Sequence, residues 1–337
     1  MAAAPNTALG DFGEEPFHQI QPAYKKDVME ARNTGGYDHP DRKDPIALVI
    51  PDDTIEDPRM KSVEGLIPES LYAVLLARAS AEKETLDHIL SVALAEYLDR
   101  PLHTLFSVST SAAIVEGLYQ GALRISRLLE HGDFGIGTFI DLDGELVVLE
   151  GVAYQIAEKG AVRIAPLDML IPYAVVTRFE EEISKKDASF RSFSEAIAFC
   201  DAMRASENLF YAFRIDGKFD AVSARVMRPV RHGTGLADAA RNQEESTFHN
   251  VTGTIVGLWT PGYASSISVP GHHFHFISDD RTRGGHVLDC AASHVSIRAC
   301  SMADLHVALP ETAEFLRADL SRDPNADLTA AERMHPK

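Results

Sequence analysis

The sequence is poor in cysteine and has no long hydrophobic run, and each absence excludes a class of protein. The three cysteines, Cys200, Cys290 and Cys300, are too few and too widely spaced for a disulfide framework. No apolar stretch approaches the roughly 18 residues that a membrane-spanning helix needs. The first residues, MAAAPNTALGDFGEEP, lack the basic and apolar regions of a signal peptide. We therefore expect a cytoplasmic protein with no membrane partner.

Basic side chains are also scarce. The 337 residues include 32 lysines and arginines against 50 aspartates and glutamates, which gives a formal net charge of −18. Nucleic acids repel such a chain, so we expect no nucleic-acid partner. Hydrophobic residues make up 45% of the sequence, which is enough for a large core, and the length is typical of two domains.

The N-terminal part is rich in proline. Residues 1–58 hold seven of the seventeen prolines and show no sustained helical or strand periodicity. Proline at this density interrupts regular backbone hydrogen bonding. We therefore predict an extended or disordered arm over 1–58, in which the stretch IALVI at 46–50 is the one candidate strand.

Residues 59–102 form a second part, predicted to be a small strand-helix-helix module. A short strand is expected at 62–67, a helix begins at Pro68, and a second helix begins near Thr85 and ends before Pro101. The order of these elements resembles a ribbon-helix-helix module. Residues 61–100 carry four basic and seven acidic side chains, however, which does not suit DNA. We predict that this module joins two subunits of a homodimer and takes no part in catalysis.

Beyond residue 103 the pattern is mainly of strands. Helices are expected at 110–118 and near 125–130, and then four strands between 134 and 165 form an antiparallel meander with turns at Asp-Gly, Glu-Gly and Lys-Gly. A strand at 171–179 precedes a helix that Ser192 and Glu195 open as a capping box.

The remaining strands belong to the C-terminal half of this region. Asp216-Gly217 is predicted to be the turn of a hairpin between LFYAFRI and FDAVSARVM. Further strands are expected at 252–259, 273–278, 286–290 and 294–299, and a helix near 311–320. The fold class is thus mixed α/β (α+β), with few helices and two mainly antiparallel β-sheet subdomains within 103–337, divided near 230–250.

A histidine cluster carries the clearest chemical signal, in GHHFHFISDDRTRGGHVLD at 271–289. Alternate residues of a strand share a face, so His273 and His275 point the same way and His272 points away. If the returning strand pairs His286 with Ile277, His286 joins the same face, whereas a slip of one residue turns it away.

Three convergent imidazoles are the ligand set of an open catalytic zinc site. Imidazole also suits iron, copper and nickel, and an HxH pair is common among histidines that bind nothing. We predict a metal site formed by His273, His275 and His286.

Several long blocks resemble the acetolactate decarboxylase family. HFHFISDDRTRGGHVLD is similar to the metal motif of that family, and GDFGIGTFIDLDGELVVLEG at 132–151 is similar to its N-terminal signature. LFYAFRIDGKFDAVSAR at 209–225 resembles a third block, and DLTAAER at 327–333 resembles the family's tail. The resemblance spans about 105–337, and Cys290 departs from it on the packing side only.

The resemblance implies the roles of the site residues. It implies that His273, His275 and His286 bind Zn²⁺. It further implies that Glu145, Arg225 and Glu332 line the same site as catalytic residues, and that Thr138 borders the substrate.

The residues themselves support part of this assignment. Glu145 shares a strand face with Val147 and Leu149, and a buried carboxylate has a raised pKa and can carry a proton near neutrality. Arg225 shares its face with small residues, which leaves room for a bidentate clamp on a carboxylate. The sequence alone equally allows a solvated carboxylate and a surface arginine at these positions, and only the resemblance distinguishes Glu332.

The expected function is zinc-dependent decarboxylation of (S)-2-acetolactate, a small-molecule substrate, to (R)-acetoin and carbon dioxide. One alternative is a cupin-like metal oxygenase, in which Asp279 would follow the two histidines of the HxH pair as a further ligand. The other is a ribbon-helix-helix regulator whose C-terminal part senses a ligand. Metal content with an acetoin assay separates the first two, and DNA binding tests the third.

Overall fold

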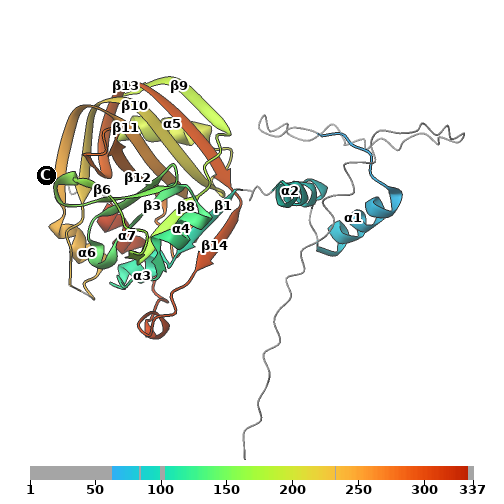
Figure 1. The fold of residues 1–337 in the computed structure, drawn as a ribbon, viewed down its shortest axis with the longest axis horizontal. Coiled ribbons are helices and arrows are strands. Elements are labelled where there is room, and N and C mark those ends of the chain that lie inside the picture. Colours follow the sequence, from blue (N-terminus) through green and yellow to red (C-terminus); the bar gives the residue numbers. More distant parts are fainter. Residues whose placement is uncertain (1–62, 83–84, 99–102, 232, 333–337) are drawn as a thin grey trace, which may run out of the picture. The chain divides into compact units, whose positions relative to one another are not determined.

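The computed structural model describes residues 63–82, 85–98, 103–231 and 233–332 (Figure 1). The predicted arm at 1–58 lies outside the described residues. None of the described helices has both the length and the apolar character that crossing a membrane requires.

The predicted pair of helices at the N-terminal end is present. Helix α1 spans Glu69–Glu82 and α2 spans Leu86–Tyr97. The carbonyl of Pro68 accepts hydrogen bonds from the amides of Leu71 and Tyr72, which places Pro68 at the start of α1. The strand predicted at 62–67 is not formed by residues 63–67, because a strand needs a neighbour to pair with and this segment has none within the described chain.

The first sheet has seven strands in the order β14-β1-β8-β3-β4-β5-β6. The predicted meander is confirmed, since β3, β4, β5 and β6 pair in sequence as antiparallel neighbours. Strand β14 alone is parallel to its neighbour. The strands are β1 (Thr104–Val108), β3 (Phe134–Thr138), β4 (Glu145–Leu149), β5 (Val152–Ile156), β6 (Val162–Ile164), β8 (Tyr173–Thr177) and β14 (Asp304–Ala308). A separate small ladder pairs β2 (Leu123–Arg124) with β7 (Leu170–Ile171).

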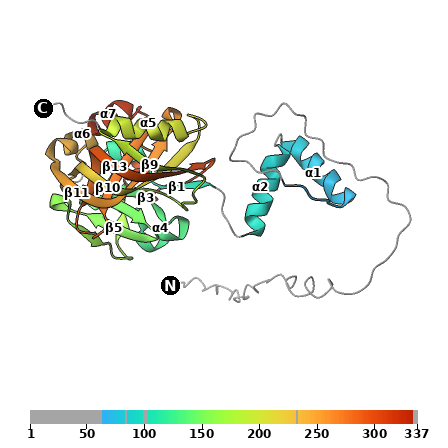
Figure 2. The same cartoon turned by 90° about the horizontal axis from the view of Figure 1, so that it is seen from above.

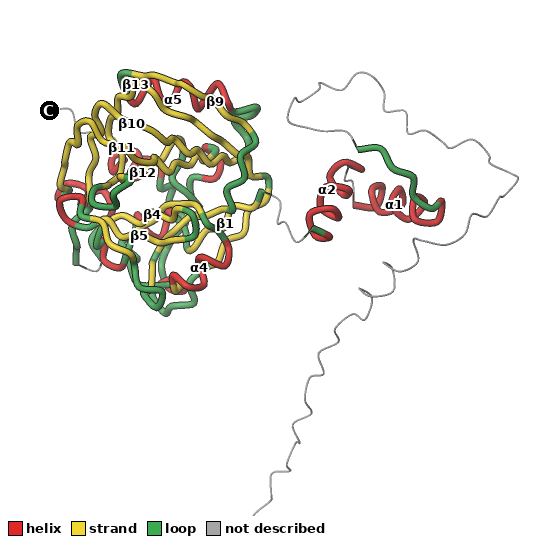
Figure 3. Tube along the Cα trace, turned by 45° about the horizontal axis from the view of Figure 1, so that its top comes forward, coloured by secondary structure: helices red, strands yellow, loops and turns green. Residues whose placement is uncertain are grey.

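The second sheet has five antiparallel strands in the order β10-β11-β12-β13-β9, and β10 also pairs with β13 (Figure 3). This extra pairing closes β10, β11, β12 and β13 into a ring. The strands are β9 (Ile183–Phe190), β10 (Phe210–Val226), β11 (Glu244–Thr260), β12 (Gly271–Ser278) and β13 (Gly284–Met302).

The hairpin predicted at Asp216-Gly217 is wrong, because β10 runs straight through these two residues. Strands β11 and β13 pair with β10 both before and after this point. The continuous strand therefore forms more ladder hydrogen bonds than a hairpin would. The Asp216 carboxylate accepts hydrogen bonds from Arg214, Arg298 and Thr254. The predicted strands at 286–290 and 294–299 are likewise one strand, β13.

The expected division near 230–250 does not coincide with a change of sheet. The chain leaves the first sheet after β8 and enters the second at β9, and β14 then returns to the first sheet. The reason is that one edge of the first sheet is completed by β14, a segment far along the chain, which local sequence patterns do not reveal.

Short helices cover the sheets. They are α3 (Ser111–Val115), α4 (Ile125–His131), α5 (Phe193–Met203), α6 (Leu236–Ala239) and α7 (Asn325–Glu332). The capping prediction for α5 is confirmed in that the Ser192 hydroxyl accepts from the amide of Glu195, although the Glu195 carboxylate accepts from the amide of Arg191 instead of Ser192. The helix predicted near 311–320 is only a 3₁₀ turn at Phe315–Arg317.

Three groups of buried side chains hold these layers together. One lies between the two sheets and includes Val175 of the first and Ile277 of the second. A second, with Phe213 and Phe276, lies inside the ring of the second sheet and under α5, and a third, with Leu128, lies under α4. Figure 2 shows α5 and α4 on opposite sides of the layered sheets. A side chain of β12 therefore faces either the ring interior or the first sheet, according to whether its number is even or odd.

Candidate metal centre and active site

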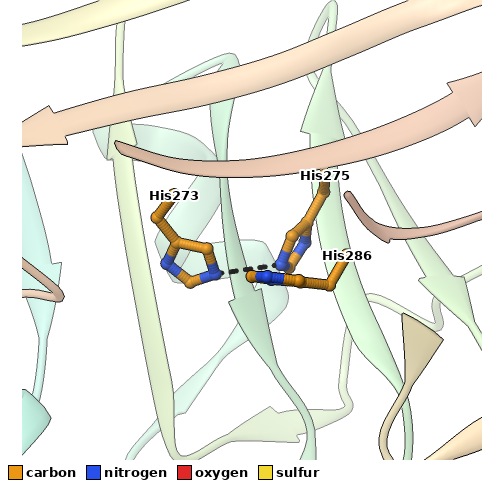
Figure 4. Close-up of side chains that lie close together, drawn as sticks. All are labelled: His273, His275 and His286. Atoms are coloured by element: carbon orange, nitrogen blue, oxygen red, sulfur yellow. Dashed lines mark hydrogen bonds between the residues drawn. The ribbon is translucent and has the colours of Figure 1, made fainter. Parts of the chain in front are cut away.

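The three predicted histidines meet on the face of the second sheet that packs towards the first (Figure 4). His273 and His275 lie on β12 and His286 lies on β13, and one ring nitrogen of each falls within 4.8 Å of the others. His286 pairs directly with His275, and Ile277 pairs with Gly284. The expected pairing of His286 with Ile277 is therefore wrong by two residues, and because two residues preserve the side-chain face, the cluster still forms.

The tautomer of His275 is set by the first sheet. Its Nδ1 lies 3.0 Å from the carbonyl oxygen of Leu146 in β4, and a carbonyl can only accept, so Nδ1 donates its hydrogen there. The lone pair is then on Nε2, which lies 3.2 Å from Nε2 of His273. Two ring nitrogens at this distance with a third imidazole beside them form a set of donors suited to one cation.

Burial keeps the imidazoles of His273 and His286 uncharged. His275 and His286 are buried. Burial, followed by the positive charge of Arg225, lowers the pKa of His273 to about 3. The pKa of His286 is also held well below its ordinary value, by burial first and then by Arg225. Metal binding requires neutral imidazole, so the site is ready for a metal at neutral pH.

Glu145 lies beside the histidines. It is the first residue of β4 and is only 6% exposed, so the solvated alternative is excluded. One carboxylate oxygen lies 3.7 Å from Nε2 of His275, and the other accepts a hydrogen bond from the amide of Met227. A buried carboxylate thus lies beside the three histidines, which we call the metal group, and one of its oxygens is on the side of His275.

Arg225 completes the same wall. It lies on β10 directly opposite His286 of β13, and it is 4% exposed, which excludes a surface arginine. Its guanidinium donates to the side-chain oxygen of Gln243 at 3.1 Å and contacts the sulfur of Met227 at 3.2 Å. The guanidinium is therefore held in a defined orientation beside the histidines.

Thr138 borders this group from β3. It is buried and lies directly opposite Glu145 in the ladder of β3 and β4. Its hydroxyl donates to the carbonyl of Gly144 at 2.9 Å. The hydroxyl hydrogen therefore stabilises the turn that positions Glu145.

Comparisons with known proteins match this region. The sequence model of the family "Alpha-acetolactate decarboxylase" matches residues 105–322. The chain is 40% identical over 230 residues to the alpha-acetolactate decarboxylase of Methanosarcina mazei, covering 68% of this chain and 80% of that protein. It is 39% identical over 232 residues to that of Lactococcus lactis subsp. cremoris, covering 68% and 98%. The crystal structure of alpha-acetolactate decarboxylase from Bacillus subtilis strain 168 matches with a TM-score of 0.66 at 33% identity, covering 68% and 100%.

The chain belongs to the alpha-acetolactate decarboxylase family. It is therefore an enzyme, a decarboxylase of the carboxy-lyase class. The family match begins at residue 105, so α1 and α2 lie outside it. Cys290, which we expect to depart from the family pattern on the packing side, is buried in the ring interior.

Glu332 is the one predicted site residue that lies beyond the end of the family match. It is the last residue of α7, and the family match ends before it, at residue 322. Leu328 and Ala331 of α7 pack into the core between the sheets, so the helix itself is docked. The Glu332 side chain lies outside the described part of the chain, and its catalytic role stays a prediction.

Two other residues near the motif lie away from the metal group. His272 faces the opposite side of β12, as predicted, and its Nε2 lies 2.7 Å from a carboxylate oxygen of Asp201 in α5. Asp279 is an exposed turn residue and is not among the grouped ligand atoms. The structure therefore gives no support to a cupin-like ligand set.

Sequence reasoning missed the groups that hold the site residues in place. Gln243 accepts from Arg225 and in turn donates to Glu245, yet it precedes a strand and carries no local signal. Met227 was detectable, since it lies two residues from Arg225 and so shares its strand face. The Leu146 carbonyl could not be found, because its partner is in the other sheet.

Proposed function

We propose that this enzyme converts (S)-2-acetolactate to (R)-acetoin and carbon dioxide with a zinc ion bound by His273, His275 and His286. The observation that carries the proposal is the meeting of three imidazoles, a buried carboxylate and a buried guanidinium at one point between the sheets. The relatives named alpha-acetolactate decarboxylase support the choice of substrate.

The residues present fit a catalytic zinc site. Three imidazole nitrogens leave a coordination position open for substrate, which distinguishes a catalytic site from a closed structural one. When bound there, the ion would act as a Lewis acid on the oxygens that become negative when carbon dioxide leaves. This electron-withdrawing chemistry makes an organic cofactor unnecessary.

Arg225 binds and orients the substrate carboxylate in this proposal. A guanidinium offers two parallel N–H donors that match the two oxygens of a carboxylate. Gln243 and Met227 hold the guanidinium on the side next to His286. The carboxylate that is to be lost is thereby placed against a fixed positive charge.

Glu145 delivers the proton. Loss of carbon dioxide from a 2-hydroxy-3-oxo acid leaves an enediolate, which must be protonated on one face to give a chiral product. The Met227 amide holds one Glu145 oxygen, and the other is directed to the metal group. Glu332 is the second candidate for this role, and Thr138 supports Glu145 from the edge of the substrate site.

The remaining parts of the proposal concern partners and location. We propose a cytoplasmic homodimer that acts on a small molecule and binds neither nucleic acid nor membrane. The acidic composition supports the last two points, because polyanions repel a chain with a net charge of −18.

The test uses the full chain with racemic acetolactate. We expect consumption of the S enantiomer, formation of (R)-acetoin, loss of turnover after chelation, and recovery with Zn²⁺. Metal content by mass spectrometry and chiral gas chromatography of the product are the measurements. Undiminished turnover in protein freed of metal, or racemic acetoin, would contradict the proposal.

A further inference from the structure

The helical module at 63–98 exposes an unusual amount of apolar surface. Of the seventeen large hydrophobic side chains that are exposed in the described chain, eleven lie in the 34 described residues of this module, although the rest of the described chain is much longer. They are Val63, Leu66, Ile67, Leu71, Val74, Leu76, Leu90, Val92, Leu94, Tyr97 and Leu98. Such a concentration marks an interaction surface.

The two helices cannot bury this surface against each other. Tyr72, Leu75 and Ala79 form one half-buried stripe along α1, while Leu71 and Val74 remain more than half exposed. Helix α2, LDHILSVALAEY, has a broad apolar face on which Leu90, Leu94 and Tyr97 lie together and remain exposed. Ala95 is its one buried residue among the described side chains.

The segment before α1 also lacks a partner for its backbone within the described chain. Residues 63–67 belong to no helix or strand and make no backbone hydrogen bond within the described chain. Their sequence nevertheless predicts a strand. A lone strand is not stable, and its N–H and C=O groups require a neighbouring strand.

We propose that residues 63–98 are the interface between two copies of this chain. Two identical segments related by a two-fold axis run antiparallel, so residues 63–67 of each copy can pair with the other and complete a two-stranded ribbon. The same axis brings α1 and α2 of each copy over the apolar surface of the other. One symmetric contact thus satisfies both the unpaired backbone and the exposed side chains.

The area is sufficient for such a dimer. Apolar side chains of this kind present roughly 100 Å² each when fully exposed. The eleven side chains are between 38% and 85% exposed. A dimer that buried them would remove roughly 600 Å² of apolar surface from water on each copy, and roughly 1,200 Å² in total. This reaches the range of stable, specific protein interfaces.

Nucleic acid is the less favoured occupant. Residues 61–100 carry four basic against seven acidic side chains, and cations are what a ribbon needs to meet phosphates. Residues 63–98 are thus the surface through which the proposed homodimer forms. This proposal does not depend on the catalytic proposal, since every predicted site residue lies after α2.

The experiment compares the full chain with Val74→Lys and Leu94→Lys, and with Ser80→Lys as the matched control. Ser80 is exposed, and it lies on the opposite side of α1 from Leu71 and about a third of a turn from Val74. Lysine preserves helix propensity, and the added positive charge lowers the net negative charge, so weaker association cannot come from charge repulsion. Sedimentation across a dilution series measures association, circular dichroism measures helix content, and acetoin formation measures catalysis.

We expect Val74→Lys and Leu94→Lys to weaken association at least about tenfold with helix content and turnover number unchanged, and Ser80→Lys to associate like the wild type. A wild-type chain that is monomeric throughout the series would overturn the proposal. So would equal association of all four proteins, or retardation of duplex DNA by the wild type at moderate salt. Loss of turnover alone would bear on the catalytic proposal and leave this one standing.

Discussion

At the scale of single residues, each histidine of the proposed metal site is positioned by its own contacts within the sheets. His275 is oriented by the Leu146 carbonyl, His273 shares its strand face, and His286 pairs across the ladder with His275 on one side and Arg225 on the other. The arrangement is rigid because all three lie on strands and not on loops, as a metal site requires for accurate geometry.

Removing one imidazole tests the metal group. The His275→Ala variant should keep two of the three ligands, bind zinc poorly, and show a kcat lower by more than about a hundredfold. The reason is that loss of a residue that only hydrogen-bonds to a metal ligand already lowers metal affinity or activity by about 10–100-fold. Metal content and acetoin formation are measured together. Full metal content and activity in this variant would contradict the assignment.

The control for this variant must be chosen from the structure. The sequence predicts that His272→Ala is nearly silent, but His272 is buried and paired with Asp201, so its removal should cost stability. His249, exposed on β11, is the better control, and His249→Ala should retain metal, turnover and melting temperature.

Arg225 and Glu145 should separate kinetically. Arg225→Lys should lower kcat/KM about a hundredfold, because lysine keeps the charge but lacks the planar pair of donors. Glu145→Gln should retain zinc and substrate binding but lower kcat by about 10²–10⁴, because the proton carrier is lost. Steady-state kinetics with metal analysis distinguishes the two. Wild-type rates in either variant would remove that residue from the mechanism.

At the scale of elements, the long strand β10 carries Arg225 to the site. It remains straight through Asp216-Gly217 because a glycine allows it: Gly217 has φ +145°, and a Cβ there would lie 2.6 Å from the carbonyl oxygen of His294. The same dipeptide that predicts a turn thus lets two long strands approach closely.

Gly217→Ala should therefore destabilise the fold by about 3 kcal/mol, from backbone strain and the contact with β13 together. Gly151→Ala is the control, since Gly151 also has positive φ, +75°, but has open space around it. Its cost should be about 1 kcal/mol. Chemical denaturation measures both, and equal effects would show that the close approach at Gly217 is unimportant.

At the scale of the whole molecule, the site exists because two sheets face each other. The ligands come from the second sheet, whereas Glu145 and the carbonyl that orients His275 come from the first. A further link joins the two layers: His103, just before β1, lies 2.9 Å from Glu182, just before β9. Glu182 also accepts from Ser301 of β13.

This link should make stability depend on pH. The hydrogen bond to Glu182 raises the pKa of His103 above 6.5. Burial alone would raise the pKa of Glu182, but hydrogen bonds from His103 and Ser301 outweigh it and bring the pKa below 4.5. The histidine's contribution is complete below pH 6.5 and is lost as pH rises through its raised pKa. The glutamate's contribution is present above pH 4.5 and is lost as pH falls through its lowered pKa.

The melting temperature of wild type minus that of His103→Gln should thus be largest between pH 4.5 and 6.5 and shrink above. Because the pair is partly exposed, the maximum should be about 2 °C. Thermal melts of both proteins from pH 5 to 9 measure it. A difference that grows with pH would contradict the assignment.

What the sequence determined by itself is local. Alternation along a strand places His273 and His275 on one face and His272 on the other, whatever lies opposite, because the backbone repeats every two residues. Turn dipeptides and helical periodicity likewise predict the meander, α4 and α5. The long motif blocks were enough to indicate the family and the metal ligands.

What only the tertiary structure decided is which residues lie opposite one another. The pairing of His286 with His275, the continuation of β10 through Asp216, and the placement of Glu145 against a histidine of the other sheet all join segments far apart in the chain. Such contacts depend on how two whole sheets pack and close, and their free energy is shared among many side chains. No short stretch of sequence contains that information, because the partner that selects each conformation lies elsewhere in the chain.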